Sequence, residues 1–162
     1  MAKLAAVTER RATFREQRKF AALTDTLVST GTLLYRRPDY LEKDTEWPQP
    51  EWLVVDGDRV VITLANNDPP HVIPLGGQPE VRAMVESMRG PLSGDFGALQ
   101  RLFRIDAAGD LASWTLTMTP QDPNALKLLR TVRVAGRGDQ IRDIRVIQAN
   151  GDEQWMQIGP SS

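Results

Sequence analysis

Residues 31–57 read GTLLYRRPDYLEKDTEWPQPEWLVVDG, and this stretch decides the fold class. Its side chains alternate in character, which predicts a strand over 27–37, a second over 40–47 and a third over 51–55. Proline presets a turn and has no N–H for a central ladder, so the corners fall at Pro38-Asp39, Pro48-Gln49-Pro50 and Asp56-Gly57. Three short strands with tight corners predict an antiparallel meander.

The same stretch carries two cations on predicted interior faces. Arg37 shares a face with Leu33 and Tyr35, and Lys43 shares one with Leu41. An unpaired buried charge is costly, so each cation needs a partner or an opening to water if this face is the interior. In the alternative interpretation both side chains lie at a rim, with their stems on apolar surface and their charges in water.

The composition is that of an ordinary globular protein. The 162 residues, 41% hydrophobic and 25% charged, suit a single domain over 1–162 with a sizeable core. The net charge of −1 argues against general nucleic-acid binding, which needs a positive surface. The absence of cysteine excludes disulfides and thiolate metal sites. No apolar run reaches the ~20 residues of a membrane span.

The rest of the chain continues the strand pattern. Alternating runs bounded by turn residues predict about ten or eleven strands in all. Those outside the opening stretch are 11–20, 59–65, 71–75, 103–106, 113–119, a run from 132 to the turn at 136–139, 141–148 and 153–158. A turn is predicted at 108–110, and Asn150-Gly151 is the strongest hairpin signal.

Between the strand blocks the apolar period changes to that of helices. A first helix starts at Pro79 and ends at Gly90-Pro91, and its apolar stripe consists of Val81, Met84, Val85 and Met88. A shorter second helix is capped by Ser93 or Asp95, and its stripe consists of Phe96, Leu99, Leu102 and Phe103. Each narrow apolar face must lie on another element, and the sheet is the only candidate.

The sequence offers no constellation for catalysis. His71 is the only histidine, which excludes a multi-histidine metal site, and there is no nucleophile elbow or phosphate-binding glycine loop. Asp95-Phe96-Gly97 and Arg137-Gly138-Asp139 spell known tripeptides, but a helix cap and a hairpin turn explain them. We therefore expect no enzyme, no cofactor and no metal. Turnover of an acyl ester is the observation that would revive an enzymatic interpretation.

The order of motifs resembles that of the LolA-type outer-membrane lipoprotein carriers and their divergent LolA-like relatives. The similar segments are 12–14, 31–38, 53–57, the helical pair at 79–103, and the final strands at 114–120 and 142–152. The resemblance implies a mainly β fold with α-helices: a half-closed antiparallel β-barrel whose open side is covered by short helices. It also implies a periplasmic protein that binds acyl chains in an apolar hollow under the helical lid and shuttles them between membranes.

This implied compartment bears on the N-terminus. The first seven residues, MAKLAAV, have no hydrophobic core long enough for a signal peptide, so the chain taken literally is cytosolic. For a periplasmic protein, we expect that an export signal has been removed ahead of Met1.

The resemblance also assigns roles to individual residues. Arg37 corresponds to the family arginine before proline, which hydrogen-bonds the backbone of the lid helices and holds them shut. The carrier hypothesis, rather than the resemblance, gives Lys43 a role: it would meet an anionic head group or carboxylate at the mouth. The hollow would be lined by Phe14, Leu33, Tyr35, Met84, Val85, Met88, Leu99, Phe103 and Leu116. In the alternative interpretation these residues fill a solid core.

Two departures from the family bear on the cargo. Lys43 stands where family carriers have aromatic residues, and the chain ends directly after its last strand. We therefore expect acyl-bearing lipids such as glycolipids, as well as lipoproteins, among the ligands. The implied partners are a membrane donor and an outer-membrane acceptor protein, without nucleic acid, and the chain is expected to be a monomer. The alternative function is a periplasmic lipid-sensing regulator that acts through a protein partner.

Overall fold

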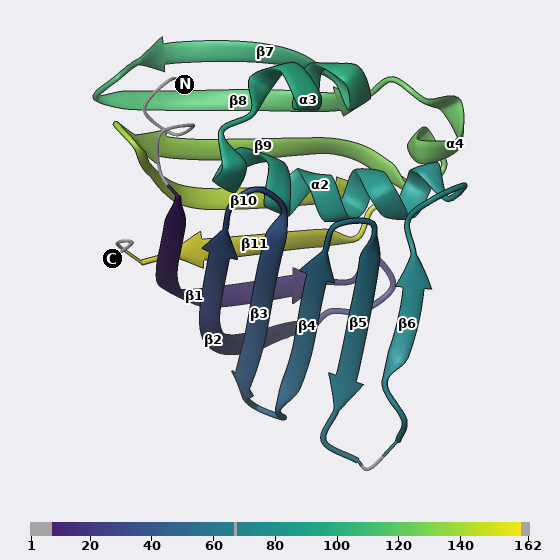
Figure 1. Ribbon diagram of the computed structural model, residues 1–162. Coiled ribbons are helices and arrows are strands. Elements are labelled where there is room, and N and C mark those ends of the chain that lie inside the picture. Colours follow the sequence, from purple (N-terminus) through teal and green to yellow (C-terminus); the bar gives the residue numbers. More distant parts are fainter. Residues whose placement is uncertain (1–7, 67, 160–162) are drawn as a thin grey trace.

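The computed structural model describes residues 8–66 and 68–159, which form eleven strands in one antiparallel sheet (Figure 1). From edge to edge the strand order is β6-β5-β4-β3-β2-β1-β11-β10-β9-β8-β7, so only β1 and β11 pair across a large sequence separation. The strands are β1 (Glu9–Lys19), β2 (Thr26–Arg36), β3 (Tyr40–Trp47), β4 (Glu51–Asp56), β5 (Arg59–Leu64), β6 (His71–Pro74), β7 (Phe103–Asp110), β8 (Ser113–Pro120), β9 (Leu129–Arg137), β10 (Gln140–Gln148) and β11 (Glu153–Ile158).

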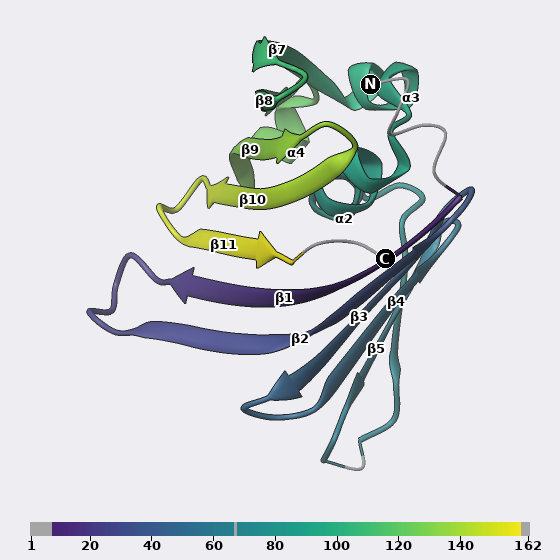
Figure 2. The ribbon, with the colours of Figure 1, turned by 90° about the vertical axis from the view of Figure 1, so that its left-hand side faces the viewer.

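The sheet is strongly coiled but not closed, because β6 and β7 form its two edges. In Figure 1, β7–β11 run across the view, whereas β3–β6 run along a crossing direction. β1 and β2, each eleven residues long, curve from one direction into the other (Figure 2). Gly31 is required at this bend, since a β-carbon there would overlap the carbonyl oxygen of Asp44 on β3. The expected half-closed antiparallel barrel is confirmed.

Three helices among the described residues complete the fold: α2 (Pro79–Ser93), α3 (Phe96–Leu102) and α4 (Pro123–Leu126). α2 lies on the sheet and contacts β2, β9 and β10, with α3 and α4 packed against it. The prediction that helices cover the open side is confirmed. None of the described helices is long and apolar enough to span a membrane.

α2 extends beyond its predicted end at Gly90-Pro91. It includes Pro91 and runs to Ser93, and it ends where Gly94 adopts a left-handed conformation with φ of 68°. A proline removes one hydrogen-bond donor but its own φ is helical, so the last turn can continue. The N–H of Gly94 then donates to the carbonyl oxygens of Gly90 and Pro91 and closes the helix. Of the two predicted caps, Asp95 is the one that caps α3, through the N–H of Ala98.

The β7–β8 hairpin also differs from the prediction. β7 continues through 108–110, and the turn falls at Leu111 and Ala112 instead. The carboxylate of Asp110 accepts from the N–H groups of Ala112 and Ser113 at 3.0 and 3.1 Å. An aspartate therefore organises the turn that follows it, which places the corner two residues later than the Ala-Gly-Asp sequence suggests.

Candidate functional site

A small, partly enclosed cavity of about 50 Å³ lies between α2 and the sheet. Its lining is mostly apolar, and three of the seven lining residues are methionine, a flexible side chain that adapts to irregular contents. The lining residues are Met84, Ser87 and Met88 of α2, Ile144 and Val146 of β10, and Gln154 and Met156 of β11. This volume is far smaller than the roughly 300–1,000 Å³ of typical ligand pockets, so α2 packs closely against the sheet.

The residues that the sequence predicts for the hollow fall into three groups. Met84 and Met88 line the cavity, and Val85 is partly buried against the core. The other six are at most 4% exposed and lie in the core of this closed structure: Phe14, Leu33, Tyr35, Leu99, Phe103 and Leu116. Their contact with an acyl chain stays a prediction.

Sequence reasoning missed the sheet side of the cavity. The sequence predicts a strand over 141–148, which contains Ile144 and Val146, but no local pattern shows that this strand lies beneath α2. Met156 and Gln154 belong to β11, which pairs with β1 only through the long-range closure of the sheet. The missing information is therefore topological.

Two arginines fasten α2 to the turns of the neighbouring strands. Arg37, which follows β2, donates through Nη2 to the carbonyl oxygen of Ser93, the last residue of α2, at 3.1 Å. In the opposite direction, Arg89 of α2 donates through Nη1 to the carbonyl oxygens of Asp39 at 2.8 Å and Gly57 at 2.7 Å. Arg37 thus makes the kind of contact that the resemblance implies. Arg89, only 5% exposed, adds a reciprocal contact that the sequence did not reveal.

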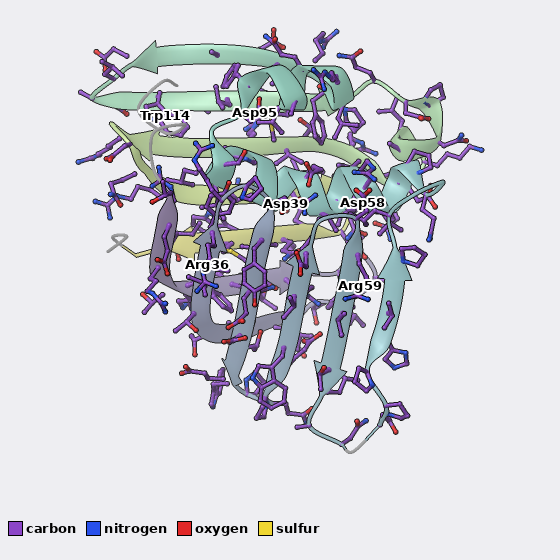
Figure 3. All side chains as sticks on the ribbon, viewed as in Figure 1. Arg36, Asp39, Asp58, Arg59, Asp95 and Trp114 are labelled. Atoms are coloured by element: carbon purple, nitrogen blue, oxygen red, sulfur yellow. The ribbon has the colours of Figure 1, made fainter. Side chains whose placement is uncertain are left out.

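The strand turns beside α2 hold further polar contacts. Figure 3 shows Asp39 and Asp58 at these turns. Arg82 of α2 lies 3.0 Å from Asp58, but the Asp58 side chain is 78% exposed, so this ion pair is weak. The hydroxyl of Tyr35 donates to the carbonyl oxygen of Pro38 at 3.1 Å, and burial raises the pKa of this phenol. Tyr35 therefore stays a neutral donor beneath the lid.

Lys43 is buried and paired. It is 6% exposed, so the rim interpretation is wrong for this residue. Its ammonium lies 2.5 Å from Glu16 Oε2 on β1 and 5.3 Å from the centroid of the Phe14 ring. Arg18 donates to the other Glu16 oxygen at 2.7 Å. Burial opposes the charge on Glu16, but Lys43 and Arg18 outweigh it and lower the pKa of the carboxyl, so Glu16 is ionised.

The residues described here contain no group of three or more His, Asp or Glu side chains that could hold a metal ion. The site is instead a helical lid over a coiled antiparallel sheet, with arginine–carbonyl fastenings and a methionine-lined cavity. The family described as outer membrane lipoprotein carrier protein LolA-like matches residues 1–161. The chain belongs to the LolA-like family. A sequence search of curated proteins finds no match for this LolA-like chain.

Solved structures share the fold of this LolA-like protein at low identity. The LolA superfamily protein NE2245 from Nitrosomonas europaea is 8% identical with a TM-score of 0.53, over 99% of this chain and 89% of that one. A putative outer membrane lipoprotein-sorting protein domain from Vibrio parahaemolyticus is 12% identical with a TM-score of 0.50, over 99% and 87%. A chain from the Pseudomonas aeruginosa MucA/MucB complex is 14% identical with a TM-score of 0.51, over 99% and 53%, so this protein spans about half of it. At such identities the likeness shows the fold alone.

Proposed function

We propose that this LolA-like protein is a periplasmic carrier that binds acyl chains of lipoproteins or other lipids between α2 and the sheet. The observation that carries the proposal is the methionine-lined cavity beneath a lid whose two sides are held differently. The family match supports a carrier-type protein. The nature of the cargo and its transfer between membranes are part of the proposal.

The two sides of α2 suggest how a chain enters. On the β2–β5 side, arginines 37 and 89 bind backbone carbonyls, and a hydrocarbon cannot replace those hydrogen bonds. On the β10–β11 side, Met84 and Met88 face Ile144, Val146 and Met156 across the cavity. An acyl chain can replace these apolar contacts, since each buried methylene contributes about 0.8 kcal/mol. We therefore propose that the cavity widens on the β10–β11 side while the arginines keep α2 attached.

Arg37 is the latch of this mechanism, since its bond to Ser93 biases α2 toward the closed position. The six predicted lining residues that are buried in the core contact the acyl chain only when α2 moves. Lys43, together with its partner Glu16, serves the polar head of the cargo.

Ligand extraction and uptake test the carrier proposal. Protein purified without detergent should release acyl lipids into organic solvent for mass spectrometry, and delipidated protein should bind a fluorescent fatty acid saturably. The variant M84L/M88L keeps the side-chain volumes but stiffens the cavity. It should bind a narrower range of chain lengths than the wild type, whereas L111M, an exposed change, should not. A protein that releases no lipid and takes up no acyl probe is not a carrier.

A second candidate function is a periplasmic lipid-sensing regulator. It is supported by the shared fold with a chain of the MucA/MucB complex, in which that protein is bound to a partner. A pull-down from envelope extract, with and without added fatty acid, discriminates between the two functions. Lipid-dependent retention of a signalling protein favours the regulator, and equal retention in both conditions counts against it.

A further inference from the structure

A second pocket has a volume of about 210 Å³ and is open to solvent. It is formed by the end of β1, the start of β2, the end of β3 and the β3–β4 turn, on the face that carries Glu16 and Lys43. Its lining residues are Glu16, Arg18, Leu27, Val28, Ser29, Lys43, Thr45, Pro48, Gln49 and Glu51. Three of these residues are apolar, namely Leu27, Val28 and Pro48, and the rest are polar or charged.

The charged groups of this pocket are built into the fold. The side chains of Glu16 and Lys43 are 1% and 7% exposed, and they form the ion pair described above. A buried ion pair is commonly no more stabilising than a well-packed apolar pair of the same volume. Its presence in an apolar sheet face is thus poorly explained by stability, and a recognition role accounts for it better.

The pocket is connected to the cavity under α2 by a hydrogen bond between their lining residues. Gln154 lines that cavity and also hydrogen-bonds the carboxylate of Glu16, which lines the open pocket. A ligand with a polar head in the open pocket can therefore direct its chain past Gln154 toward Met84 and Met88. An amphiphile fits this sequence of polar and apolar surfaces.

The charges of the pocket indicate the class of head group. Arg18 and Lys43 are cationic and Glu16 and Glu51 are anionic, so the lining charges balance. A purely anionic head would lie beside two carboxylates. Arg18 on β1 and Glu51 on β4 belong to opposite ends of the pocket, since β2 and β3 lie between them in the sheet. A head with one negative and one positive group can satisfy both ends.

We propose that this pocket binds the zwitterionic head of the cargo, with a phosphate toward Arg18 and Lys43 and an ammonium toward Glu51. The inference rests on the proposed carrier function, because it assumes a lipid in the neighbouring cavity. It assigns Lys43 to a head group that is neutral overall rather than to an anionic one.

Binding of three single-chain lipids with the same acyl chain tests this assignment. The probes carry a phosphoethanolamine head (zwitterionic), a phosphoglycerol head (anionic) or a glucosyl head (neutral). We expect the wild type to bind the phosphoethanolamine lipid at least about tenfold more tightly than either of the others, as removal of a hydrogen bond to a charged group predicts. Equal affinity for the three probes, or tightest binding of the anionic or glucosyl probe, overturns the proposal.

Two substitutions of partly exposed residues test the location of the site without creating a cavity in the core. R18Q should weaken both phosphate-bearing probes and leave the glucosyl probe unchanged. E51Q should reduce the preference for the phosphoethanolamine over the phosphoglycerol head. Their controls are R15Q, on the opposite face of β1, and E46Q, outside the pocket on β3. If R18Q and E51Q behave like their controls while acyl chains still bind, the head-group site is wrong. If no probe binds, the carrier function itself fails.

Discussion

Arg89 provides the sharpest test of how α2 is held. The substitution R89M removes the donor to the carbonyl oxygens of Asp39 and Gly57 and keeps most of the apolar stem. A hydrogen bond to a charged group contributes about 1.5–3 kcal/mol, so two of them contribute about 3–6 kcal/mol. Because both carbonyls lie at turns and regain water when α2 lifts, the lower limit of about 3 kcal/mol applies.

This loss corresponds to an increase of roughly 100-fold in the population with α2 detached, at 1.4 kcal/mol for each factor of ten. Hydrogen exchange of the α2 amides, followed by mass spectrometry, measures that population directly. R89M also leaves Glu86 unpaired, with its side chain 16% exposed. The double variant R89M/E86Q therefore separates lid release from the cost of an isolated carboxylate.

R82M is the matched control, because Arg82 lies on the same helix and pairs with the exposed side chain of Asp58. An exposed pair contributes about 0–1 kcal/mol, so exchange of α2 should change by less than about fivefold. Equal exchange rates in R89M/E86Q and R82M, in proteins of unchanged overall stability, would show that α2 is held by its apolar contacts alone. The arginine fastening would then be refuted.

Three further predictions concern other parts of the molecule. Arg37→Leu should leave uptake of a fatty-acid probe intact but slow its delivery to acceptor vesicles; lost uptake in a folded protein would make Arg37 structural instead. Lys43→Met should lower the free energy of unfolding by about 3–5 kcal/mol, and adding Glu16→Leu should restore most of it, as measured by urea unfolding. The pKa of Asp44 is raised to about 6, first by burial and then by a hydrogen bond with Glu42. An acid whose folded pKa exceeds its ordinary value of 3.8 favours folding when protonated, so this contribution is lost as the pH rises from about 4 to about 6. Asp44→Asn should flatten stability over that range, and an unchanged urea-unfolding profile between pH 4 and 7 would contradict the assignment.

Local signals account for the success of the strand prediction. The strand at 40–47 lies where alternation and the flanking prolines place it, and Asn150-Gly151 connects β10 to β11 as expected. Both signals act within a few residues, through turn dihedrals and the two-residue period of a strand. The errors at the end of α2 and at the β7–β8 turn are also local. The helix error arises because Pro91 lacks an N–H but has a helical φ, so α2 continues past it. The turn error arises because the Asp110 carboxylate accepts a hydrogen bond from Ala112 and so moves the turn beyond Asp110.

The candidate site was only partly predictable, because its contacts join distant segments. Sequence reasoning showed that Lys43 needs a partner, but Glu16 lies 27 residues away on β1, with β2 between the two strands. The pair forms across the position of Gly31, where no side chain stands between them on the interior face. A glycine in a strand signals close approach, yet nothing local identifies what approaches. The volume beneath α2 likewise depends on how side chains from β10 and β11 meet the helix, which periodicity does not determine.

On the proposed function, the wall between the two spaces orients the cargo. Glu16 is held by Lys43, Arg18 and Gln154, so it stays in place when a ligand binds. Gln154 is uncharged and can exchange its hydrogen bond to Glu16 for one to water or to a head group at a small net cost. The acyl chain of the cargo can therefore pass Gln154 but not the Glu16–Lys43 ion pair. This keeps the head group of the cargo at the strand ends and its acyl chain beneath α2. The cargo is released when its acyl chain withdraws from the methionines beneath α2. Release therefore does not require the buried Glu16–Lys43 ion pair to break.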